Sequence, residues 1–207
     1  MSGELHVVNL GKSYRQWASE WRRVSSWFVS SIAPREEHWA LKDVSFSIGP
    51  GEAVGVIGQN GAGKSTLLKL ITGVTRPTQG AVRLSGRVSA ILEHGMGFNP
   101  DLTGRENAYR WAGLMGHLQS DIQRAMPEIE AFAEIGAYFD QPMRTYSSAM
   151  QMRVAFSVAT AFKPDLLIVD EALPVGDSYF RHRSFARMRQ FSDDGVSIIL
   201  VSHSLGD

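Results

Sequence analysis

Apolar residues follow strand-like spacing at several places along the chain. Residues 4–10 (ELHVVNL) alternate between apolar and polar positions, as a half-buried strand does. Residues 40–58 (ALKDVSFSIGPGEAVGVIG) predict two strands joined by a Pro-Gly turn. The apolar runs within 164–172 (PDLLIVDEA) and 195–203 (GVSIILVSH) predict strands buried on both faces, at the centre of a parallel sheet.

Helical spacing separates these predicted strands. A helix is predicted from Lys64, with the apolar side chains of residues 67–71 directed toward the core. From about residue 103 to residue 160 the pattern is helical, most clearly in SAMQMRVAFSVATAF (148–162). Strands alternating with helices predict an α/β layered domain, and the helical stretch at about 95–160 predicts an inserted α-helical subdomain.

An aromatic segment at about 15–34 interrupts the strand pattern near the N-terminus. Trp17, Trp21 and Phe28 recur there at helical spacing, and Pro34 ends the segment. Four of the chain's five tryptophans lie within the first 40 residues. Two interpretations remain open: an amphipathic helix packed on the domain, or a helix that touches a membrane surface or a membrane partner.

The composition is ordinary for a globular protein and excludes several kinds of site. Lys and Arg together number 21, as do Asp and Glu, so the formal net charge is zero and the electrostatic footprint of a nucleic-acid-binding protein is absent. The 207-residue chain has no cysteine, which excludes disulfides and thiolate metal sites. No apolar run reaches bilayer length, and residues 1–10 lack the apolar stretch of a signal peptide. We therefore expect a soluble or peripherally bound protein.

A phosphate-loop pattern, G-x-x-x-x-G-K-[ST], occurs at residues 58–66 (GQNGAGKST), between a predicted strand and a predicted helix. Glycines allow consecutive backbone N–H groups to close around phosphate oxygens, and the helix start adds partial positive charge. Lys64 is expected to reach the β- and γ-phosphates, and the Ser65 hydroxyl to bind Mg²⁺. The predicted nucleotide contacts are Gly58, Gln59, Asn60, Gly61, Ala62, Gly63, Lys64, Ser65 and Thr66.

Polar residues at the ends of two predicted strands extend this site. Asp170 ends an apolar strand, where a buried carboxylate needs a partner such as Mg²⁺. Glu171 would orient and deprotonate the attacking water, and the alternative is an acidic pair that caps a helix. His203 follows the apolar strand 197–202, which should lie beside the Asp170 strand, so we expect His203 to contact the γ-phosphate.

The ordered set of phosphate loop, Ser147, Asp170–Glu171, Asp177 and VSH at 201–203 resembles the nucleotide-binding domain of ABC transporters, over nearly the whole chain. The resemblance implies an α/β P-loop NTPase (RecA-like) core with a mostly parallel sheet, an antiparallel β subdomain and an inserted α-helical subdomain. It also implies an ATPase that works as a homodimer, in which two copies sandwich ATP and Mg²⁺. Asp177 is assigned to the same nucleotide site.

The signature motif of that family, most often L-S-G-G-Q, binds the ATP held by the other copy. Here TYSSAM (145–150) stands in its place, and the resemblance assigns Ser147 and Ser148 to ATP. Only the serine of the usual motif is retained. A hydroxyl and free N–H groups at a helix start still make an anion site, although the lost glycines affect how closely the backbone can approach.

One branch of the family is especially similar, on TYSSAM, LTGREN (102–107) and DEALPVGD (170–177). It is the ATPase subunit of bacterial exporters that move lipid-linked O-antigen, capsule or teichoic acid. This implies a membrane permease partner, no nucleic acid, and a peripheral place on the cytoplasmic face of the inner membrane. The alternatives are a soluble ABC-type ATPase acting on ribosomes or DNA, an exporter of a different substrate, and a non-catalytic nucleotide-gated scaffold.

Three departures from the family pattern remain. Glu93 stands where the family usually has a glutamine, and we expect it to bind Mg²⁺ or water and to sense the permease. Tyr14 is favoured as the residue that stacks on adenine, and Trp39 is its rival. The chain stops at Asp207, where such domains normally continue, so we expect further C-terminal structure in the complete protein.

Overall fold

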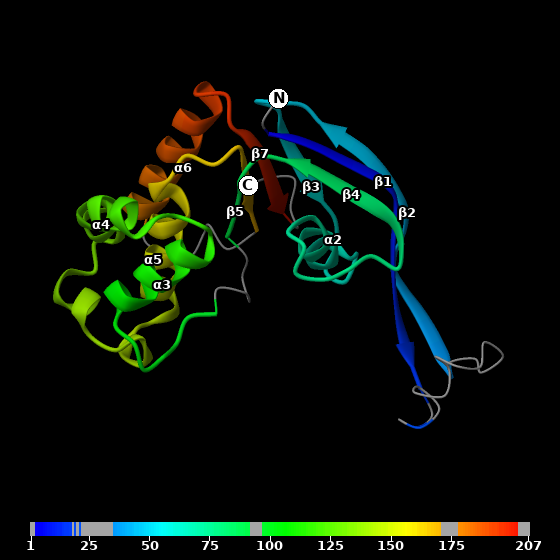
Figure 1. Cartoon of the computed structure of the whole chain (residues 1–207), viewed down its shortest axis with the longest axis horizontal. Helices are drawn as coiled ribbons and strands as arrows, with labels where there is room; N and C mark the ends of the chain where they lie inside the picture. The colour runs from blue at the N-terminus through cyan, green and yellow to red at the C-terminus, as the bar shows by residue number, and fades with distance from the viewer. Residues whose placement is uncertain are drawn as a thin grey trace. The chain divides into compact units, whose positions relative to one another are not determined.

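The computed structural model describes residues 3–17, 19, 21, 35–91, 97–170 and 178–202. They form two compact units (Figure 1). The sheet–helix unit comprises the residues up to 4, residues 48–57 and those from 85 onward. The phosphate-loop unit comprises residues 5–47 and 58–84.

A four-stranded parallel sheet forms the centre of the sheet–helix unit. Its order is β3 (Ala53–Ile57), β7 (Ser197–Ser202), β6 (Leu166–Val169) and β5 (Val88–Ile91). All three strand pairs are parallel. Every residue of β6 is buried, as a strand covered on both faces requires. The prediction that the two apolar runs form central strands is therefore confirmed.

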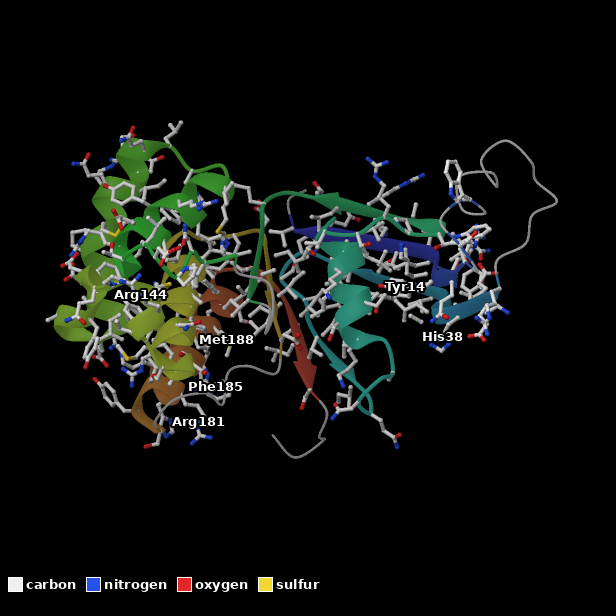
Figure 2. The ribbon with its side chains drawn as sticks, turned by 90° about the horizontal axis from the view of Figure 1, so that it is seen from below. Tyr14, His38, Arg144, Arg181, Phe185 and Met188 are labelled. Carbon is white, nitrogen blue, oxygen red and sulfur yellow. The ribbon has the colours of Figure 1, made fainter. Side chains whose placement is uncertain are left out.

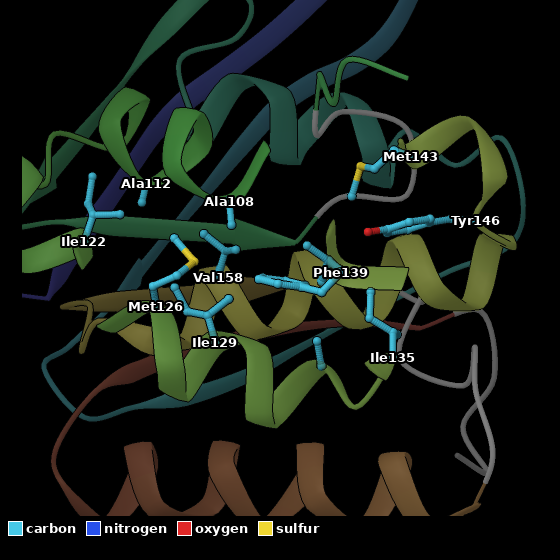
Figure 3. Packing of buried hydrophobic residues seen from close by; sticks show 12 residues of the cluster. Ala108, Ala112, Ile122, Met126, Ile129, Ile135, Phe139, Met143, Tyr146 and Val158 are labelled. Carbon is cyan, nitrogen blue, oxygen red and sulfur yellow. The ribbon is translucent and has the colours of Figure 1, made fainter. Parts of the chain in front are cut away.

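Helices fill most of the chain between β5 and β6. They are α3 (Gly104–Leu114), α4 (Gln119–Ala133) and α5 (Ser148–Ala161), with short 3₁₀ turns η1 (Gly136–Asp140) and η2 (Met143–Thr145) before α5. Their apolar faces meet in one cluster, which includes the fully buried Phe139 (Figure 3). The helical periodicity of this stretch thus produces a core of its own.

A second cluster joins these helices to the sheet and to α6 (Ser178–Asp193). Phe132, Phe156 and Phe180 pack there with ring centroids 5.7–5.9 Å apart. On α6, Met188 is buried, whereas Arg181 and Phe185 are exposed on the outer face (Figure 2). The amphipathic pattern of α6 therefore fixes which face covers the sheet.

The phosphate-loop unit contains a second sheet and one helix. The sheet has the order β2 (Glu36–Ile48), β1 (Glu4–Gln16), β4 (Gln79–Ser85), and β1 and β2 run antiparallel (Figure 1). The helix is α2 (Lys64–Ile71). Its buried residues are Leu67, Leu68, Leu70 and Ile71, as the sequence predicts. Most of the aromatic segment at 15–34 lies outside the described residues. No helix within the described ranges is long and apolar enough to cross a bilayer.

His117 packs against an aromatic ring at the turn between α3 and α4. Its imidazole stacks on Phe162, with ring centroids 3.7 Å apart and an interplanar angle of 17°. Burial of the ring lowers the pKa of His117, and the positive charge of Arg87 lowers it further, while Asp121 acts in the opposite direction. The folded protein therefore favours the neutral imidazole.

We predict that this preference makes stability depend on pH. The His117 imidazole takes up a proton more readily in the unfolded chain than in the folded one. The contribution of His117 to the free energy of unfolding is therefore fully present above about pH 6.5, the ordinary histidine pKa, and is lost as the pH drops below it. Urea unfolding measured from about pH 7.5 to about pH 5.5 should show a smaller loss for His117→Gln than for the wild type. His182→Gln changes an exposed histidine on α6 and should keep the wild-type dependence. Equal losses in His117→Gln and wild type would contradict this assignment.

Candidate functional site

The phosphate loop joins strand β3 directly to helix α2. Gly61 and Gly63 have positive φ values of 83° and 94°, which residues with a Cβ rarely adopt. Gly63 also has no room for a side chain, because a Cβ there would lie 2.5 Å from the carbonyl oxygen of Ala40. The backbone conformation of the loop therefore requires glycine at Gly63 and favours it at Gly61.

The Lys64 ammonium group folds back over this loop. Its Nζ donates hydrogen bonds to the carbonyl oxygens of Gly58, at 2.6 Å, and of Gln59, at 3.3 Å. An ammonium group has three donors, so these contacts leave one for a ligand oxygen. The first turn of α2 contains no acidic residue to neutralise the positive end of its dipole. The loop, the ammonium group and the helix start together favour an anion.

Most of the remaining side chains of the motif are exposed. Gln59, Asn60 and Ala62 are exposed, and the Ala62 N–H donates to the Gln59 carbonyl at 3.1 Å. Ser65 is exposed and Thr66 partly buried on the first turn of α2. The Ser65 hydroxyl is an oxygen donor of the kind that Mg²⁺ prefers.

Asp170 follows the buried strand β6 and is itself buried, with 7% of its surface exposed. Its backbone N–H donates to the carbonyl of Ile91, the last residue of β5, at 3.0 Å. Strand β7 lies beside β6, with Val169 opposite Leu200, so the predicted neighbourhood of the two strands is confirmed. A carboxylate at this sheet edge is also a suitable Mg²⁺ ligand. Four predicted site residues lie outside the described residues: Glu93, Glu171, Asp177 and His203.

Ser147 is the N-cap of α5. Its backbone is extended, and its Oγ accepts a hydrogen bond from the Met150 N–H at 3.2 Å. Ser147 and Ser148 are both exposed. The first N–H groups of a helix lack intrahelical acceptors, and the first turn of α5 contains no acidic residue. The serine cap therefore stabilises a helix start that can also face an anion.

Residues 102–107 (LTGREN) contain the end of the loop before α3, the N-cap Thr103 and the first turn of α3. Thr103 and Glu106 form a reciprocal capping box, with the two backbone–side-chain bonds at 3.1 and 2.8 Å. The buried Asn107 amide donates to the carbonyls of Asn99, Leu102 and Thr103. These bonds hold the loop to the helix that follows it. The motif therefore fixes the conformation of residues 99–103 relative to α3.

Sequence reasoning missed the role of Tyr146, the residue before the cap. Its side chain is buried, and its hydroxyl donates to the Tyr138 carbonyl at 2.6 Å and accepts from the Gly104 N–H at 3.1 Å. Burial raises the pKa of the Tyr146 phenol, so the hydroxyl keeps its proton at neutral pH. The sequence shows Tyr146 only as a polar aromatic residue directly before a serine cap, and its hydrogen-bond partners lie 8 and 42 residues away along the chain.

The two aromatic residues expected near adenine both belong to the phosphate-loop unit. Tyr14, on β1, has 48% of its surface exposed (Figure 2), and the Lys12 ammonium lies 5.5 Å from its ring centroid. Trp39, on β2, packs over Gly11, where an added Cβ would come within 2.9 Å of the indole ring. Tyr14 therefore presents the more accessible ring.

Known proteins resemble this chain over most of its length. The sequence model of the ABC transporter family matches residues 41–174. The O-antigen export system ATP-binding protein RfbB of Myxococcus xanthus is 50% identical over 167 residues, which cover 81% of this chain and 38% of the relative. RfbB of Klebsiella pneumoniae is 48% identical over 83% of this chain and 70% of its own length. The teichoic acids export ATP-binding protein TagH of Enterococcus faecalis is 43% identical over 81% of this chain and 37% of its own length.

Solved structures of ATP-binding cassettes have the same fold. The dimeric cassette MJ0796, in a post-hydrolysis state bound to ADP and phosphate, superposes with a TM-score of 0.78 and 22% identity, over 97% of this chain and 88% of that chain. The predicted fold class, with its parallel sheet, second sheet and helices, is confirmed. This chain spans only 38% of the Myxococcus relative. With a family match over residues 41–174 and close relatives named as export ATP-binding proteins, the chain belongs to the ABC transporter family.

Proposed function

We propose that this chain is the ATP-hydrolysing subunit of an exporter that moves a lipid-linked polysaccharide, such as O-antigen or teichoic acid, across the cytoplasmic membrane. The observation that carries the proposal is the 48% identity to a Klebsiella O-antigen export protein over most of both chains. The phosphate loop and the serine-capped start of α5 supply the chemistry. The zero net charge disfavours the alternative of an ATPase acting on ribosomes or DNA.

ATP binding begins at the phosphate loop. The backbone N–H groups of the loop and the start of α2 bind phosphate oxygens, and Lys64 neutralises the β- and γ-phosphates. Tyr14 stacks on adenine, in preference to Trp39, because its ring is the more exposed. Mg²⁺ would be held by Ser65 and Asp170, with Glu93 a further candidate, and it supplies neutralisation of phosphate charge.

Hydrolysis needs groups at the ends of the central strands. Glu171 follows Asp170, and the carboxylate of Glu171 orients the attacking water and takes up its proton. His203 follows β7 and contacts the γ-phosphate. The parallel pairing of β6 with β7 supports this assignment, because the carboxyl ends of parallel strands lie along one edge of the sheet.

A second copy of the chain completes each site. Ser147 and Ser148 at the start of α5 bind the γ-phosphate of the ATP held by the partner copy, through the helix N–H groups and the Ser147 hydroxyl. Asp177 is a further proposed contact of the nucleotide. A paired arrangement is supported by the cassette MJ0796, which has the same fold and forms a dimer in its ADP- and phosphate-bound state.

A membrane permease is the partner that this dimer drives, and the names of the export relatives support it. The chain then acts at the cytoplasmic face of the membrane as a peripheral subunit. Glu93 senses the permease. The exported glycan is recognised as a lipid-linked chain through the permease.

The first prediction from this proposal concerns Gly63. Gly63→Ala should weaken ATP binding about tenfold or more, because the displaced loop loses hydrogen bonds to a charged group. Titration of the full-length protein with a fluorescent ATP analogue measures this. Gly116→Ala is the control: Gly116 also has a positive φ of 88°, but a Cβ there meets no atom within 4 Å, so ATP affinity should be unchanged. Wild-type affinity in Gly63→Ala would contradict the assigned loop geometry.

The second prediction concerns the base. Glu171→Gln should leave ATP binding intact and reduce turnover by about a hundredfold or more, since a general base contributes that much. Phosphate release by the full-length protein with its permease in liposomes measures turnover. Glu128→Gln is the control: it alters a carboxylate paired with Arg187 at 2.7 Å and should leave turnover at the wild-type rate. Near-normal hydrolysis by Glu171→Gln would rule out Glu171 as the base.

A further inference from the structure

We infer that Tyr146 is a positioning residue, whose phenol hydroxyl fixes the Ser147-led start of α5 to the first turn of α3. The inference rests on the proposed role of Ser147 in the partner's ATP site. Tyr146 directly precedes Ser147, and its ring lies in the helical core beside Phe139 and Met143 (Figure 3). The exposed Ser147 therefore directly follows a side chain that is buried in the helical core.

The hydroxyl makes two hydrogen bonds to backbone groups of other elements. It accepts from the N–H of Gly104, the first residue of α3, and donates to the carbonyl of Tyr138 in η1. Gly104 and Tyr146 are 42 residues apart in sequence. A helix-start N–H needs an acceptor outside its own helix, and the phenol supplies one here. The Tyr146 hydroxyl oxygen therefore joins α3 and η1 to the residue before the α5 cap.

Gly104 leaves the space that this oxygen occupies. A Cβ added at Gly104 would lie 2.3 Å from the Tyr146 hydroxyl oxygen, which is closer than real contacts allow. The next nearest atoms are the Phe139 carbonyl oxygen, at 3.1 Å, and the Phe139 ring, at 3.3 Å, and a shift of a few tenths of an ångström would relieve these tight contacts. The glycine of LTGREN and the tyrosine of TYSSAM are therefore matched to each other.

Further bonds hold together the segments that contain the two partners of the hydroxyl. Backbone N–H groups of Met143 and Arg144 donate to the carbonyls of Leu102 and Pro100, both at 2.9 Å. Close by, Arg105 pairs with Asp140 of η1 and with Glu130 of α4, each at 2.7 Å. The loop before α3 and the turns before α5 therefore form one connected structure around the phenol.

This structure controls the geometry of Ser147 through the residue before it. Ser147 and Ser148 are exposed, and the Ser147 hydroxyl accepts a local hydrogen bond, from Met150 of its own helix. That bond shapes the first turn of α5 but does not tie the turn to another element. The direction of the α5 start is then set through Tyr146, one residue away. A site completed by a second chain needs its groups held to within about half an ångström. Loss of the Tyr146 contacts should therefore weaken the ATP-bound dimer without altering the phosphate loop.

The test uses the full-length protein carrying Glu171→Gln, in which ATP accumulates without turnover and holds two copies together. Adding Tyr146→Phe keeps the ring and removes the oxygen. The ATP concentration that half-saturates dimer formation, measured by light scattering, should rise about fivefold or more, as expected for lost buried hydrogen bonds. ATP binding to the separate chains, measured at low protein concentration, should be unchanged.

Tyr138→Phe is the matched control, because it removes the hydroxyl of an exposed tyrosine in the same region and should leave dimer formation unchanged. Gly104→Ala should weaken the dimer as Tyr146→Phe does. The double variant should be no weaker than Tyr146→Phe alone, since removing the oxygen makes room for the Cβ.

The inference is overturned if Tyr146→Phe lowers only the melting temperature and leaves the ATP dependence of dimer formation at the parental value. It is also overturned if the effects of Gly104→Ala and Tyr146→Phe simply add. Failure of the parent protein to form any ATP-dependent dimer is a different result, because it contradicts the proposed function from which the role of Ser147 follows.

Discussion

Partial positive charge at helix starts is the physical feature on which the proposed site depends. The chain presents two such starts, at α2 and α5, and neither first turn contains an acidic residue. Glycines with positive φ shape the first start into a loop, and Lys64 covers it. A serine cap shapes the second. In the proposed function, the start of α2 binds the phosphates of its own nucleotide and the start of α5 binds the nucleotide held by a second copy.

The parallel sheet adds the reactive groups by topology. Strands β6 and β7 lie side by side at its centre, and their buried side chains fix their register. The carboxyl ends of neighbouring parallel strands lie along one edge of a sheet, and on this basis the proposed mechanism assigns Asp170, Glu171 and His203 to one reaction, although about thirty residues separate the two strands. The sheet also buries Asp170 at the end of β6, and a carboxylate is an oxygen ligand of the kind that Mg²⁺ prefers.

Local patterns in the sequence predict the central strands, α2 with its buried face, and the glycines of the phosphate loop, because each depends on residues close together in the chain. The contacts around Tyr146 could not be predicted in this way. They join positions 42 residues apart, and no periodicity marks the space that Gly104 leaves for a hydroxyl. The stacking of His117 on Phe162 could not be predicted because it is also non-local. The three hydrogen bonds donated by the Asn107 amide could not be predicted because they depend on the shape of the loop. LTGREN and TYSSAM stand out separately in the sequence, and the structure shows that they are neighbours.

A divided active site is tested most directly by mixing two inactive chains. Lys64→Ala removes the ammonium group of the phosphate loop. Ser147→Arg blocks the start of α5 that faces the ATP of the partner copy. A dimer of one chain of each kind contains one site with an intact Lys64 from one copy and an intact Ser147 from the other. The full-length proteins, reconstituted together with the permease, are predicted to release phosphate at up to about a quarter of the wild-type rate, since about half of the dimers are mixed and each has one complete site. Activity of the mixture no higher than that of either variant alone would contradict the account.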